Sequence, residues 1–323
     1  MPKAIRIHTN GGAEVLKWEE VSVGDPGPGE ARVRQHAVGL NYIDVYHRSG
    51  QYPAPLPSGI GMEGAGVVEA LGADVTGLKP GDRVAYASMP LGAYCEVRNM
   101  PAERLLRLPD RISFEQAAAM MLQGITAQYL IKRTYKVQRG DAVLFHAAAG
   151  GLGLITCQWL NAIGATVIGT AGSDEKAALA KAHGCRHAVN YKSENFVERV
   201  KEITGGAGVA VVYDSVGKDT FQGSLDCLRP FGMLVAVGNS SGAVPPIDLG
   251  KACRGSLFLT RPSIVAYTAK REDLLASAND LFDIVLSGQV RIEVNQRYAL
   301  RDAAQAHRDL EARRTTGSTI LLP

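Results

Sequence analysis

One stretch of the chain decides its fold: Ala142-Val-Leu-Phe-His-Ala-Ala-Ala-Gly-Gly-Leu-Gly-Leu-Ile-Thr-Cys-Gln-Trp159. The apolar first half predicts a buried strand over residues 142–149, and the glycines that follow predict a tight turn. Apolar residues at three-to-four spacing beyond the turn predict a helix that runs to about Ile163. The stretch is therefore a strand, a glycine turn and a helix in succession.

The glycine turn suits a phosphate group. Backbone N–H groups at the start of a helix point at an anion, and the helix dipole favours negative charge there. Gly150, Gly151 and Gly153, with Leu152 between them, leave room for phosphate oxygens and for the helix to pack on the strand. Such glycines also occur for packing alone. The strand before them and the helix after them favour the pyrophosphate of a dinucleotide.

The residues after this turn alternate between predicted strands and helices. Short apolar runs predict strands at 166–170, 187–191, 209–213, 233–237 and 256–260. Segments 174–183 and 195–203 predict the intervening helices. This alternation is typical of an α/β fold with a doubly wound parallel sheet and helices on both faces.

The rest of the chain has a different texture. Before residue 125, short apolar runs are separated by Gly- and Pro-rich turns, which predicts an irregular, largely antiparallel β domain. The tail carries predicted helices at 272–287 and 302–311 and a last strand at 317–323. Because a lone strand is unstable in water, we expect the tail to rejoin the first domain. The predicted domains are residues 1–124 with 266–323, and residues 125–265.

Composition narrows the function classes. The 323 residues are 46% hydrophobic and 21% charged, and the formal net charge of +3 is too small to indicate nucleic acid or a membrane surface. The sequence shows no secretory stretch and no run of ~18 apolar residues, so we expect a cytoplasmic protein without a membrane span. The five cysteines include no close pair, which predicts reduced thiols rather than disulfides or a zinc site.

The second predicted strand distinguishes two nucleotide cofactors. An NAD site places an acid about 20 residues after the glycine turn, to bind the ribose 2′-hydroxyl. Residues 169–172 read Gly-Thr-Ala-Gly, without an acid. Gly172, the Ser173 hydroxyl, the Lys176 ammonium and Tyr191 at the end of the third strand would suit a 2′-phosphate instead. The sequence therefore favours NADPH over NADH, with Lys176 as an ordinary solvated helix residue as the alternative.

A later loop also falls at the carboxyl end of a predicted strand, where open α/β sheets bind ligands. It reads Gly238-Asn-Ser-Ser-Gly242, and Asn239 and Ser240 are candidates to contact the nicotinamide half of the cofactor, with Gly238 and Ser241 beside them. Ordinary turn chemistry is the alternative, because Asn, Ser and Gly are common in turns.

Seven motifs carry a resemblance to a known family. They are His8-Thr-Asn-Gly-Gly12, Gly39-Leu-Asn-Tyr-Ile-Asp44, Arg48-Ser-Gly-Gln-Tyr-Pro53, Gly92-Ala-Tyr94, Phe145-His-Ala-Ala-Ala-Gly-Gly-Leu-Gly153, Val212-Tyr-Asp-Ser-Val-Gly217 and Gly238-Asn-Ser-Ser-Gly242. Over essentially the whole chain, the sequence resembles the zeta-crystallin-like quinone oxidoreductases of the zinc-free medium-chain dehydrogenase/reductase superfamily.

The resemblance implies a GroES-like β domain with an inserted Rossmann domain, and an assembly that is a homodimer or homotetramer. It also implies NADPH-dependent reduction of a quinone, commonly by one electron to the semiquinone. Carried onto this sequence, the cofactor contacts of the family would be Asn41, Tyr42, Ile43, Asp44, Tyr46, Tyr129, Gly151, Ser173, Lys176, Tyr191, Asn239 and Ser240.

The zinc ligands of related alcohol dehydrogenases are missing from this sequence. Residues 41–44 contain no cysteine, Met62 stands where those enzymes have a histidine, and the lobe of four close cysteines is absent. We therefore expect no metal and no metal-polarised alcohol oxidation.

We expect the nicotinamide in the cleft between the predicted domains, near Asn41, Tyr46 and Tyr52. The two tyrosines would stack on an aromatic substrate or donate a hydrogen bond to it, and wall packing without a proton role is the alternative. Two other functions stay open. One is NADPH-dependent reduction of the double bond of an enone or 2-alkenal. The other, a lesser one, is an RNA-binding or structural role, for which the pair Arg313-Arg314 is weak support.

Overall fold

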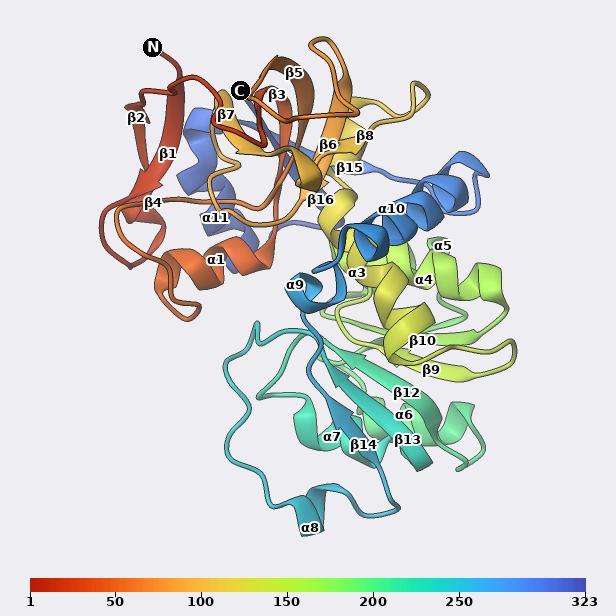
Figure 1. Cartoon of the computed structure of the whole chain (residues 1–323). Coiled ribbons are helices and arrows are strands. Elements are labelled where there is room, and N and C mark those ends of the chain that lie inside the picture. The colour runs from red at the N-terminus through yellow and green to blue at the C-terminus, as the bar shows by residue number, and fades with distance from the viewer. The chain divides into compact units, whose positions relative to one another are not determined.

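The chain forms two compact units. The computed structural model describes residues 1–323, with the side chains of all except Lys251. Unit 1 comprises Met1–Ile125, Thr268–Leu286 and Ile292–Pro323, and unit 2 comprises Thr126–Tyr267 and Ser287–Arg291. Each unit has its own apolar core. Figure 1 shows the helices and strands of both units. Among the described residues, no helix is both long and apolar enough to cross a bilayer.

Unit 2 is built on a six-stranded parallel sheet in the order β11-β10-β9-β12-β13-β14. The chain starts at β9 in the middle, moves out to β11, and returns to β12 on the other side, which is the doubly wound order. The predicted fold class is thus confirmed. The strands are β9 (Ala142–Phe145), β10 (Thr166–Ala171), β11 (His187–Asn190), β12 (Val209–Asp214), β13 (Leu228–Ala236) and β14 (Phe258–Thr260).

The helices of unit 2 begin where polar side chains can cap them. Ser173 caps one helix and Asn195 another, each by accepting hydrogen bonds from backbone N–H groups. All six residues of β12 are buried, as a strand covered on both faces requires. The helices are α4 (Gly151–Ile163), α5 (Asp174–Ala182), α6 (Phe196–Ile203), α7 (Phe221–Asp226), α8 (Leu249–Ala252) and α9 (Ile264–Tyr267).

The first strand of unit 2 is shorter than the predicted 142–149. β9 ends at Phe145, although the His146 N–H still donates to Tyr213 O on β12 at 3.0 Å. Ala147 then adopts a positive φ of 55°, and Gly150 N donates back to Ala147 O at 2.9 Å. Residues 146–150 therefore belong to the turn, which the apolar composition alone could not distinguish from strand.

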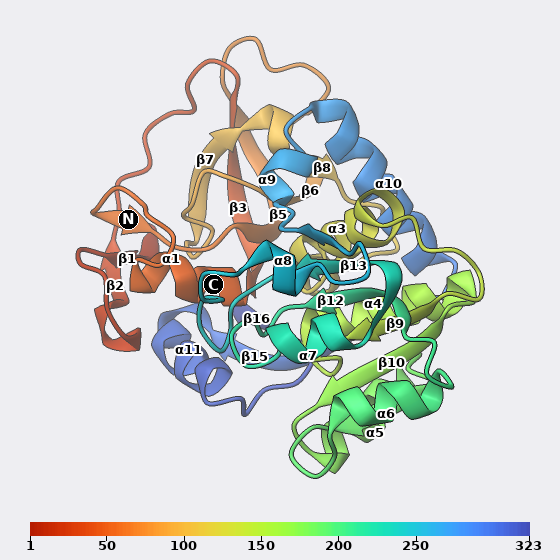
Figure 2. The same ribbon diagram turned by 90° about the horizontal axis from the view of Figure 1, so that it is seen from below.

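Unit 1 contains a seven-stranded sheet in the order β15-β16-β3-β5-β6-β8, with β7 also paired to β3, and a smaller sheet β2-β1-β4. The pairings of β3 with β5 and of β5 with β6 are antiparallel, as predicted (Figure 2). The strands are β1 (Lys3–Ile7), β2 (Lys17–Glu20), β3 (Glu30–Leu40), β4 (Ser58–Gly59), β5 (Glu63–Leu71), β6 (Arg83–Ala87), β7 (Val97–Pro101), β8 (Leu106–Arg107), β15 (Val294–Ala299) and β16 (Ser318–Leu322).

The tail of the chain completes this sheet. β16 pairs antiparallel with β3, with Thr319 opposite Leu40 and Leu321 opposite Val38. Before it come α10 (Arg271–Leu286) and α11 (Ala303–Glu311), and Ala303 and Ala306 join the core of unit 1. The final strand thus finds a partner, as the instability of a lone strand predicts.

Three helices in the first half of the chain were not predicted: α1 (Tyr42–Ser49), α2 (Phe114–Ala118) and α3 (Met121–Tyr129). α1 begins at Asn41, whose N–H donates to Asp44 Oδ2 at 2.9 Å, and ends at Gly50 with a φ of 81°. Its eight residues are too few for a clear apolar period, so the start and stop residues were its only signals. Residues Leu130–Thr134 continue α3 as a π-helical turn.

Candidate active site

The start of α4 offers unsatisfied backbone donors. Its N-cap residue Gly150 provides no side-chain cap, whereas α2, α5 and α6 are capped by Ser113, Ser173 and Asn195. The first N–H groups of a helix have no partner within the helix, and the dipole there favours negative charge. The turn that the sequence assigned to a pyrophosphate therefore has the donors that an anion needs.

Two glycines of this turn meet different surroundings. A Cβ atom on Gly153 would lie 2.6 Å from both Ala147 O and Ala148 O, so only glycine lets α4 begin this close to the turn. A Cβ atom on Gly150 would meet nothing closer than Ala147 O at 3.3 Å. Gly153 thus shapes the turn, and Gly150 leaves space above it. Together with Gly151 and Leu152 they fit the phosphate contact expected of them.

The predicted 2′-phosphate residues gather at the ends of β10 and β11. Ser173 Oγ accepts a hydrogen bond from Lys176 N at 3.3 Å, and a Cβ atom on Gly172 would lie 2.6 Å from the Tyr191 hydroxyl. Glu175 follows in the same helical turn, and its hydrogen bond with Ser173 holds the pKa of the Glu175 carboxyl below its usual value. The strand tip is free of acids, but the first turn of the helix after it contains two, Asp174 and Glu175.

The loop Gly238–Ser241 packs on the loop that follows β12. Ser240 N donates to Ser215 O at 3.2 Å, and Ser241 Oγ donates to Val216 O at 2.8 Å. The Asn239 amide donates to Gly238 O at 2.9 Å and accepts from Arg261 Nη2 at 3.1 Å. These predicted residues therefore lie at the carboxyl edge of the sheet, and Arg261 joins them. Sequence reasoning did not select Arg261, which follows β14.

A buried polar network lies beneath the glycine turn and was also missed. His146 Nδ1 is 2.9 Å from Thr170 Oγ1, and His146 Nε2 is 3.0 Å from Ser224 Oγ. Ser224 Oγ donates to Asp214 Oδ2 at 2.8 Å, while Asp214 Oδ1 accepts from Gly217 N at 3.0 Å. Burial lowers the pKa of His146, so the ring is neutral. The network joins the ends of β9, β10 and β12, and it holds in place the loops that would contact a nucleotide.

Tyr129 lies elsewhere in unit 2, against a partner that the sequence did not indicate. Its ring stacks on that of Tyr267 with centroids 4.4 Å apart and an interplanar angle of 11°. Arg133 covers the Tyr267 ring at 5.1 Å, and Thr134 Oγ1 donates to the Tyr267 hydroxyl at 2.9 Å. Burial raises the pKa of Tyr129 to about 12, so its hydroxyl remains protonated. The stack stands beside the π-helical turn, a feature frequent at functional sites.

In unit 1, α1 and the loop after it bring three tyrosines together. The rings of Tyr42 and Tyr46 have centroids 5.3 Å apart, and those of Tyr46 and Tyr52 are 5.0 Å apart. Tyr52 N donates to Tyr46 O at 3.0 Å, which fixes the loop against the helix. Tyr46 is buried, whereas Tyr42, Ile43 and Tyr52 are half-buried. Burial, and next the Glu311 carboxylate, raise the pKa of Tyr42.

Asn41 and Asp44 sit at the buried start of α1. Asn41 Nδ2 donates to Glu63 Oε2 at 2.6 Å, and Gln123 Nε2 donates to Asn41 Oδ1 at 3.1 Å. The Asp44 side chain has no exposed surface, and its Oδ2 accepts from Asn41 N and from the Tyr94 hydroxyl, each at 2.9 Å. Burial raises the pKa of Asp44 to about 7 and that of Glu63 to about 8. Glu63 follows Met62, and only its place in that motif could have drawn attention to it.

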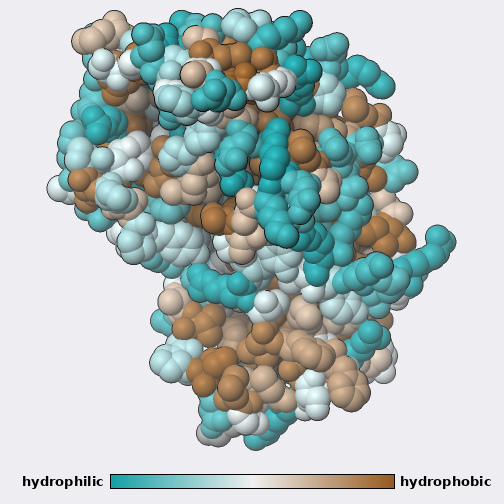
Figure 3. Space-filling view, viewed as in Figure 1, coloured by the Kyte–Doolittle hydropathy of each residue, from teal (hydrophilic) through white to brown (hydrophobic). Residues whose placement is uncertain are grey.

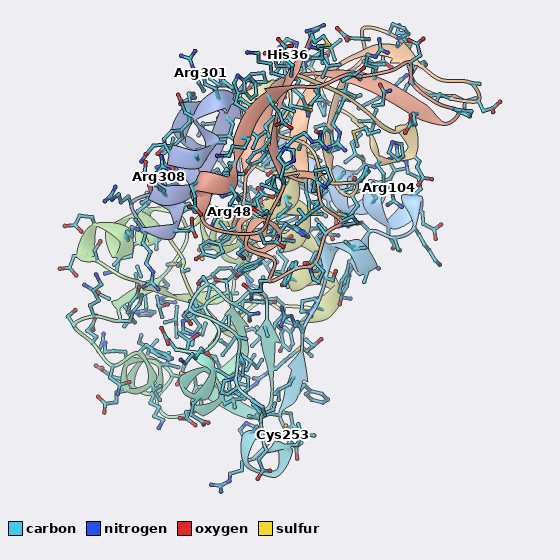
Figure 4. All side chains as sticks on the ribbon, turned by 90° about the vertical axis from the view of Figure 1, so that its left-hand side faces the viewer. His36, Arg48, Arg104, Cys253, Arg301 and Arg308 are labelled. Atoms are coloured by element: carbon cyan, nitrogen blue, oxygen red, sulfur yellow. The ribbon has the colours of Figure 1, made fainter. Side chains whose placement is uncertain are left out.

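Arg48 anchors α1 to α11. Its Nη1 and Nη2 donate to the two carboxylate oxygens of Glu311 at 2.9 and 2.8 Å, and Nη1 is 3.1 Å from His307 Nδ1. Figure 4 labels Arg48 and, on α11, Arg308. The Arg48 side chain is 3% exposed. Burial, and next the Arg48 charge, lower the pKa of His307 to about 3. The helix that carries the tyrosines is thus held by a bidentate ion pair beside a neutral histidine.

No group of three or more His, Cys, Asp or Glu side chains suited to a metal ion occurs among the described residues. The five cysteines are all free thiols, and four of them are buried.

Comparison with known proteins identifies the family. A model for the alcohol dehydrogenase GroES-like domain matches residues 27–134, and one for zinc-binding dehydrogenases matches residues 151–281. The quinone oxidoreductase of Pseudomonas aeruginosa is 54% identical over 325 residues, covering 100% of both chains. The 2-haloacrylate reductase of a Burkholderia species is 48% identical, covering 100% of this chain and 99% of its own.

The structure agrees with the sequence relatives. The Escherichia coli quinone oxidoreductase complexed with NADPH superposes with a TM-score of 0.98 at 49% identity, covering 99% of this chain and 100% of its own. The likeness includes both units and the glycine turn that begins α4. The chain therefore belongs to the quinone oxidoreductases of the medium-chain dehydrogenase/reductase superfamily, which join a GroES-like domain to a Rossmann domain.

Proposed function

We propose that this protein reduces quinones with NADPH. The observation that carries the proposal is the uncapped start of α4 above the glycine turn, in a chain whose full length matches a quinone oxidoreductase complexed with NADPH. When bound, NADPH supplies a hydride equivalent, that is two electrons and a proton, which balances either the reduction of two quinones by one electron each to semiquinones or, with one further proton from solvent, of one quinone to its hydroquinone. The chain's own residues bind and orient the reactants.

The residues of unit 2 divide the nucleotide among them. The backbone of Gly150, Gly151, Leu152 and Gly153 would bind the pyrophosphate at the helix start. Lys176 and Ser173, with Gly172 and Tyr191 beside them, would bind the 2′-phosphate, whose charge the Lys176 ammonium balances. Remaining cofactor contacts are proposed for Tyr129, Gly238, Asn239, Ser240 and Ser241, and in unit 1 for Tyr42, Ile43 and Asp44.

The residues of unit 1 would position the substrate. The rings of Tyr46 and Tyr52 pack on each other with centroids 5.0 Å apart, so the half-buried Tyr52 would stack on a flat quinone and the buried Tyr46 would position it. The Asn41 amide can donate to a carbonyl oxygen as negative charge develops there. We also propose that the chain divides into two domains, a GroES-like domain formed by residues 1–124 with 266–323 and a Rossmann domain formed by residues 125–265.

NADPH oxidation with a panel of quinones tests this proposal. We expect turnover with 1,4-benzoquinone and 1,2-naphthoquinone, faster with NADPH than with NADH. Electron paramagnetic resonance during turnover separates a one-electron product, which the family resemblance favours, from a two-electron product. Absence of turnover with every quinone would contradict the proposal.

A second candidate is the reduction of an activated carbon–carbon double bond. The likeness to a 2-haloacrylate reductase at 48% identity supports it. That reaction adds a hydride to one carbon and needs a proton at the other, for which the phenols of Tyr46 and Tyr52 are the proposed donors. A 2-alkenal or 2-haloacrylate assayed beside the quinones decides which substrate class is turned over faster.

We also propose that two copies of the chain associate through the edge of the unit 2 sheet. β14 is the last strand of that sheet, so one side of its backbone is unpaired within the chain. Phe258 on β14 is 55% exposed, and Phe231 and Leu249 nearby are 71% and 66% exposed. Figure 3 shows apolar side chains gathered over the lower part of unit 2. A second copy of this strand would continue the sheet and cover the apolar surface.

Light scattering on the purified protein tests the association. We expect the mass of a dimer or a multiple of it, and a shift towards the mass of the monomer in Phe258→Asp. Phe221→Asp would be an unsuitable control, because the Phe221 side chain packs against the core of unit 2. Val265→Asp is the matched control, because the Val265 side chain is 54% exposed and lies outside the strand.

The five free thiols also favour a reducing compartment, and we propose the cytoplasm, which cell fractionation would test.

A further inference from the structure

Asn41 belongs to a line of four buried polar side chains. Ser318 Oγ donates to Gln123 Oε1 at 2.8 Å, Gln123 Nε2 donates to Asn41 Oδ1 at 3.1 Å, and Asn41 Nδ2 donates to Glu63 Oε2 at 2.6 Å. Their exposed fractions are 4% for Ser318, 8% for Gln123, 5% for Asn41 and 0% for Glu63. The line therefore determines which side of the Asn41 amide carries its N–H groups.

This orientation of the amide is favoured by an ionised Glu63, both of whose carboxylate oxygens accept hydrogen bonds. Glu63 Oε2 accepts from Asn41, and Glu63 Oε1 accepts from Leu122 N at 2.9 Å. A proton on Oε2 would face the Asn41 N–H and break that hydrogen bond. The carboxylate also packs directly on the backbone, because a Cβ atom on Gly39 would overlap Oε2. Glu63 therefore has little freedom to turn away.

A second arrangement satisfies the same four side chains when Glu63 is protonated. The Glu63 hydroxyl then donates to the oxygen of a turned Asn41 amide, and the Asn41 nitrogen donates to Oε1 of a turned Gln123. Gln123 Nε2 donates to Ser318 Oγ, and Ser318 keeps its hydrogen for Ala119 O, 2.8 Å away. In the observed arrangement that single hydrogen faces two acceptors, Ala119 O and Gln123 Oε1. The observed arrangement thus hydrogen-bonds the ionised form of Glu63, whereas the second arrangement hydrogen-bonds its protonated form and leaves the Ser318 hydrogen with a single acceptor.

The charges around Glu63 allow both forms. Burial raises the pKa of Glu63 to about 8, the hydrogen bonds from Asn41 and Leu122 oppose the rise, and the Asp44 charge adds to it. The titratable groups that interact with Glu63 are Asp44 on α1 and Tyr94 after β6. Both groups are acids, and the Tyr94 hydroxyl donates a hydrogen bond to Asp44 Oδ2 at 2.9 Å.

We propose that Glu63 and Gln123 are positioning residues for Asn41, and that the proton on Glu63 decides which side of the amide offers its spare N–H. An amide has two donor hydrogens, and the line uses one of them, so the other is available to a reactant. The inference rests on the proposed function in one respect, namely that the observed orientation serves turnover by placing this N–H at a carbonyl oxygen that gains negative charge.

The first test needs no cofactor and no turnover. In the cofactor-free full chain, labelled at asparagine, we expect the ¹³Cγ and ¹⁵Nδ2 signals of Asn41 to titrate between about pH 6 and about pH 9, following the Glu63 carboxyl. In Glu63→Gln the new amide donates to the Asn41 oxygen at every pH, so the change near pH 8 should disappear and only a change near pH 7 should remain, from Asp44, whose Oδ2 accepts from Asn41 N. Signals that do not change with pH in the unsubstituted chain would overturn the proposal, whatever the activity.

The second test separates positioning from folding. Glu63→Gln should lower kcat with 1,2-naphthoquinone on the order of tenfold and remove the rise of kcat with pH, while the melting temperature is kept or raised because no charge is buried. In Gln123→Leu only Glu63 still orients the Asn41 amide, so kcat should fall by less than in Glu63→Gln. Gln35→Leu is the matched control: Gln35 is 4% exposed in the same unit and donates to the Tyr86 hydroxyl and to Ala93 O, outside the line of four side chains.

A double substitution and the Asn41 titration together distinguish a failure of the positioning role of Glu63 from a failure of the proposed quinone reduction. In an Asn41→Ala background, Glu63→Gln should lower kcat no further, because its effect passes through Asn41. A full additional loss, or an equal loss of kcat in Gln35→Leu, would overturn the positioning role. A titrating Asn41 signal in a chain that reduces no quinone would leave the hydrogen-bond switch standing and contradict the proposed function instead. If Glu63→Gln fails to fold, Gln123→Leu and the Asn41 titration decide the question.

Discussion

The carbonyl oxygen of Ala147 lies where a side chain on Gly153 would have to go: a Cβ atom there would be 2.6 Å away. Gly153→Ala should therefore push α4 off its turn and destabilise the protein by about 2 kcal/mol or more. Gly150→Ala, whose Cβ meets Ala147 O only at 3.3 Å, should change stability by less than about 1 kcal/mol. Urea unfolding measures both.

The same pair separates shape from binding. The Gly150 methyl group would intrude on the space above the helix start, so Gly150→Ala should weaken NADPH binding in a fluorescence titration while the protein remains folded. If Gly150→Ala bound NADPH with unchanged affinity, the phosphate would not lie at this turn.

The ion pair of Arg48 with Glu311 should matter more than an exposed one. Glu311→Gln leaves the Arg48 charge buried beside the neutral His307, and we expect a loss of about 2 kcal/mol in unfolding free energy. The control is Glu115→Gln, which removes the ion pair of Glu115 with Arg297. The Arg297 side chain is 50% exposed and that of Glu115 is 40% exposed, so the loss should be less than about 1 kcal/mol. Equal losses would show that the Arg48 pair does not anchor α1.

The buried acids and His307 predict opposite dependences of stability on pH. Asp44 has a pKa raised from 3.8 to about 7 in the fold, so its stabilising contribution is complete below about pH 4 and is lost as pH rises through about 7. His307 has a pKa lowered from 6.5 to about 3, so its contribution is present above about pH 6.5 and is lost as pH falls towards 3.

Substitutions should remove these slopes one at a time. Asp44→Asn should flatten the loss of unfolding free energy between about pH 4 and about pH 7, and His307→Asn should flatten the loss below pH 6.5, each by at most about 1.4 kcal/mol per pH unit. The control Asp110→Asn concerns a fully exposed side chain and should leave the profile unchanged. A pH profile that keeps its shape in Asp44→Asn would refute the raised pKa.

Lys176 should select the phosphorylated cofactor. Lys176→Met removes the ammonium proposed for the 2′-phosphate and leaves the negative Glu175 in the same turn, so KM for NADPH should rise on the order of tenfold. KM for NADH should change little, because NADH carries no 2′-phosphate. Lys181→Met, later on α5, is the control. Equal rises for both cofactors would place the 2′-phosphate elsewhere.

Regular patterns allowed most of unit 2 to be predicted. Apolar runs located the parallel strands and the helices α4, α5 and α6, because buried parallel strands have strong local signals, although β13 begins at Leu228, before the predicted 233, and α7 was missed. The end of β9 was wrong, since the positive φ of Ala147 is imposed by the turn and not by the residue. The short helix α1 gave no apolar period, and its position was found only in the structure.

The supporting residues of the site were harder to predict. Glu63, Asp214 and His146 act through contacts with residues that lie far away in the sequence: Glu63 meets Asn41 and Leu122, and His146 meets Thr170 and Ser224. Nothing in their local sequence shows these partners. Residues proposed to touch the nucleotide could be named because a glycine turn and strand ends have local signatures, whereas the network beneath them has none.

The most direct measurement is steady-state NADPH oxidation by the purified full-length protein, with 1,2-naphthoquinone and a short 2-alkenal compared side by side at equal concentration. We predict kcat/KM for the quinone that exceeds the value for the alkenal on the order of a hundredfold, and a preference for NADPH over NADH. Faster reduction of the alkenal, or no oxidation of NADPH with any quinone, would contradict the assignment of this chain as a quinone reductase.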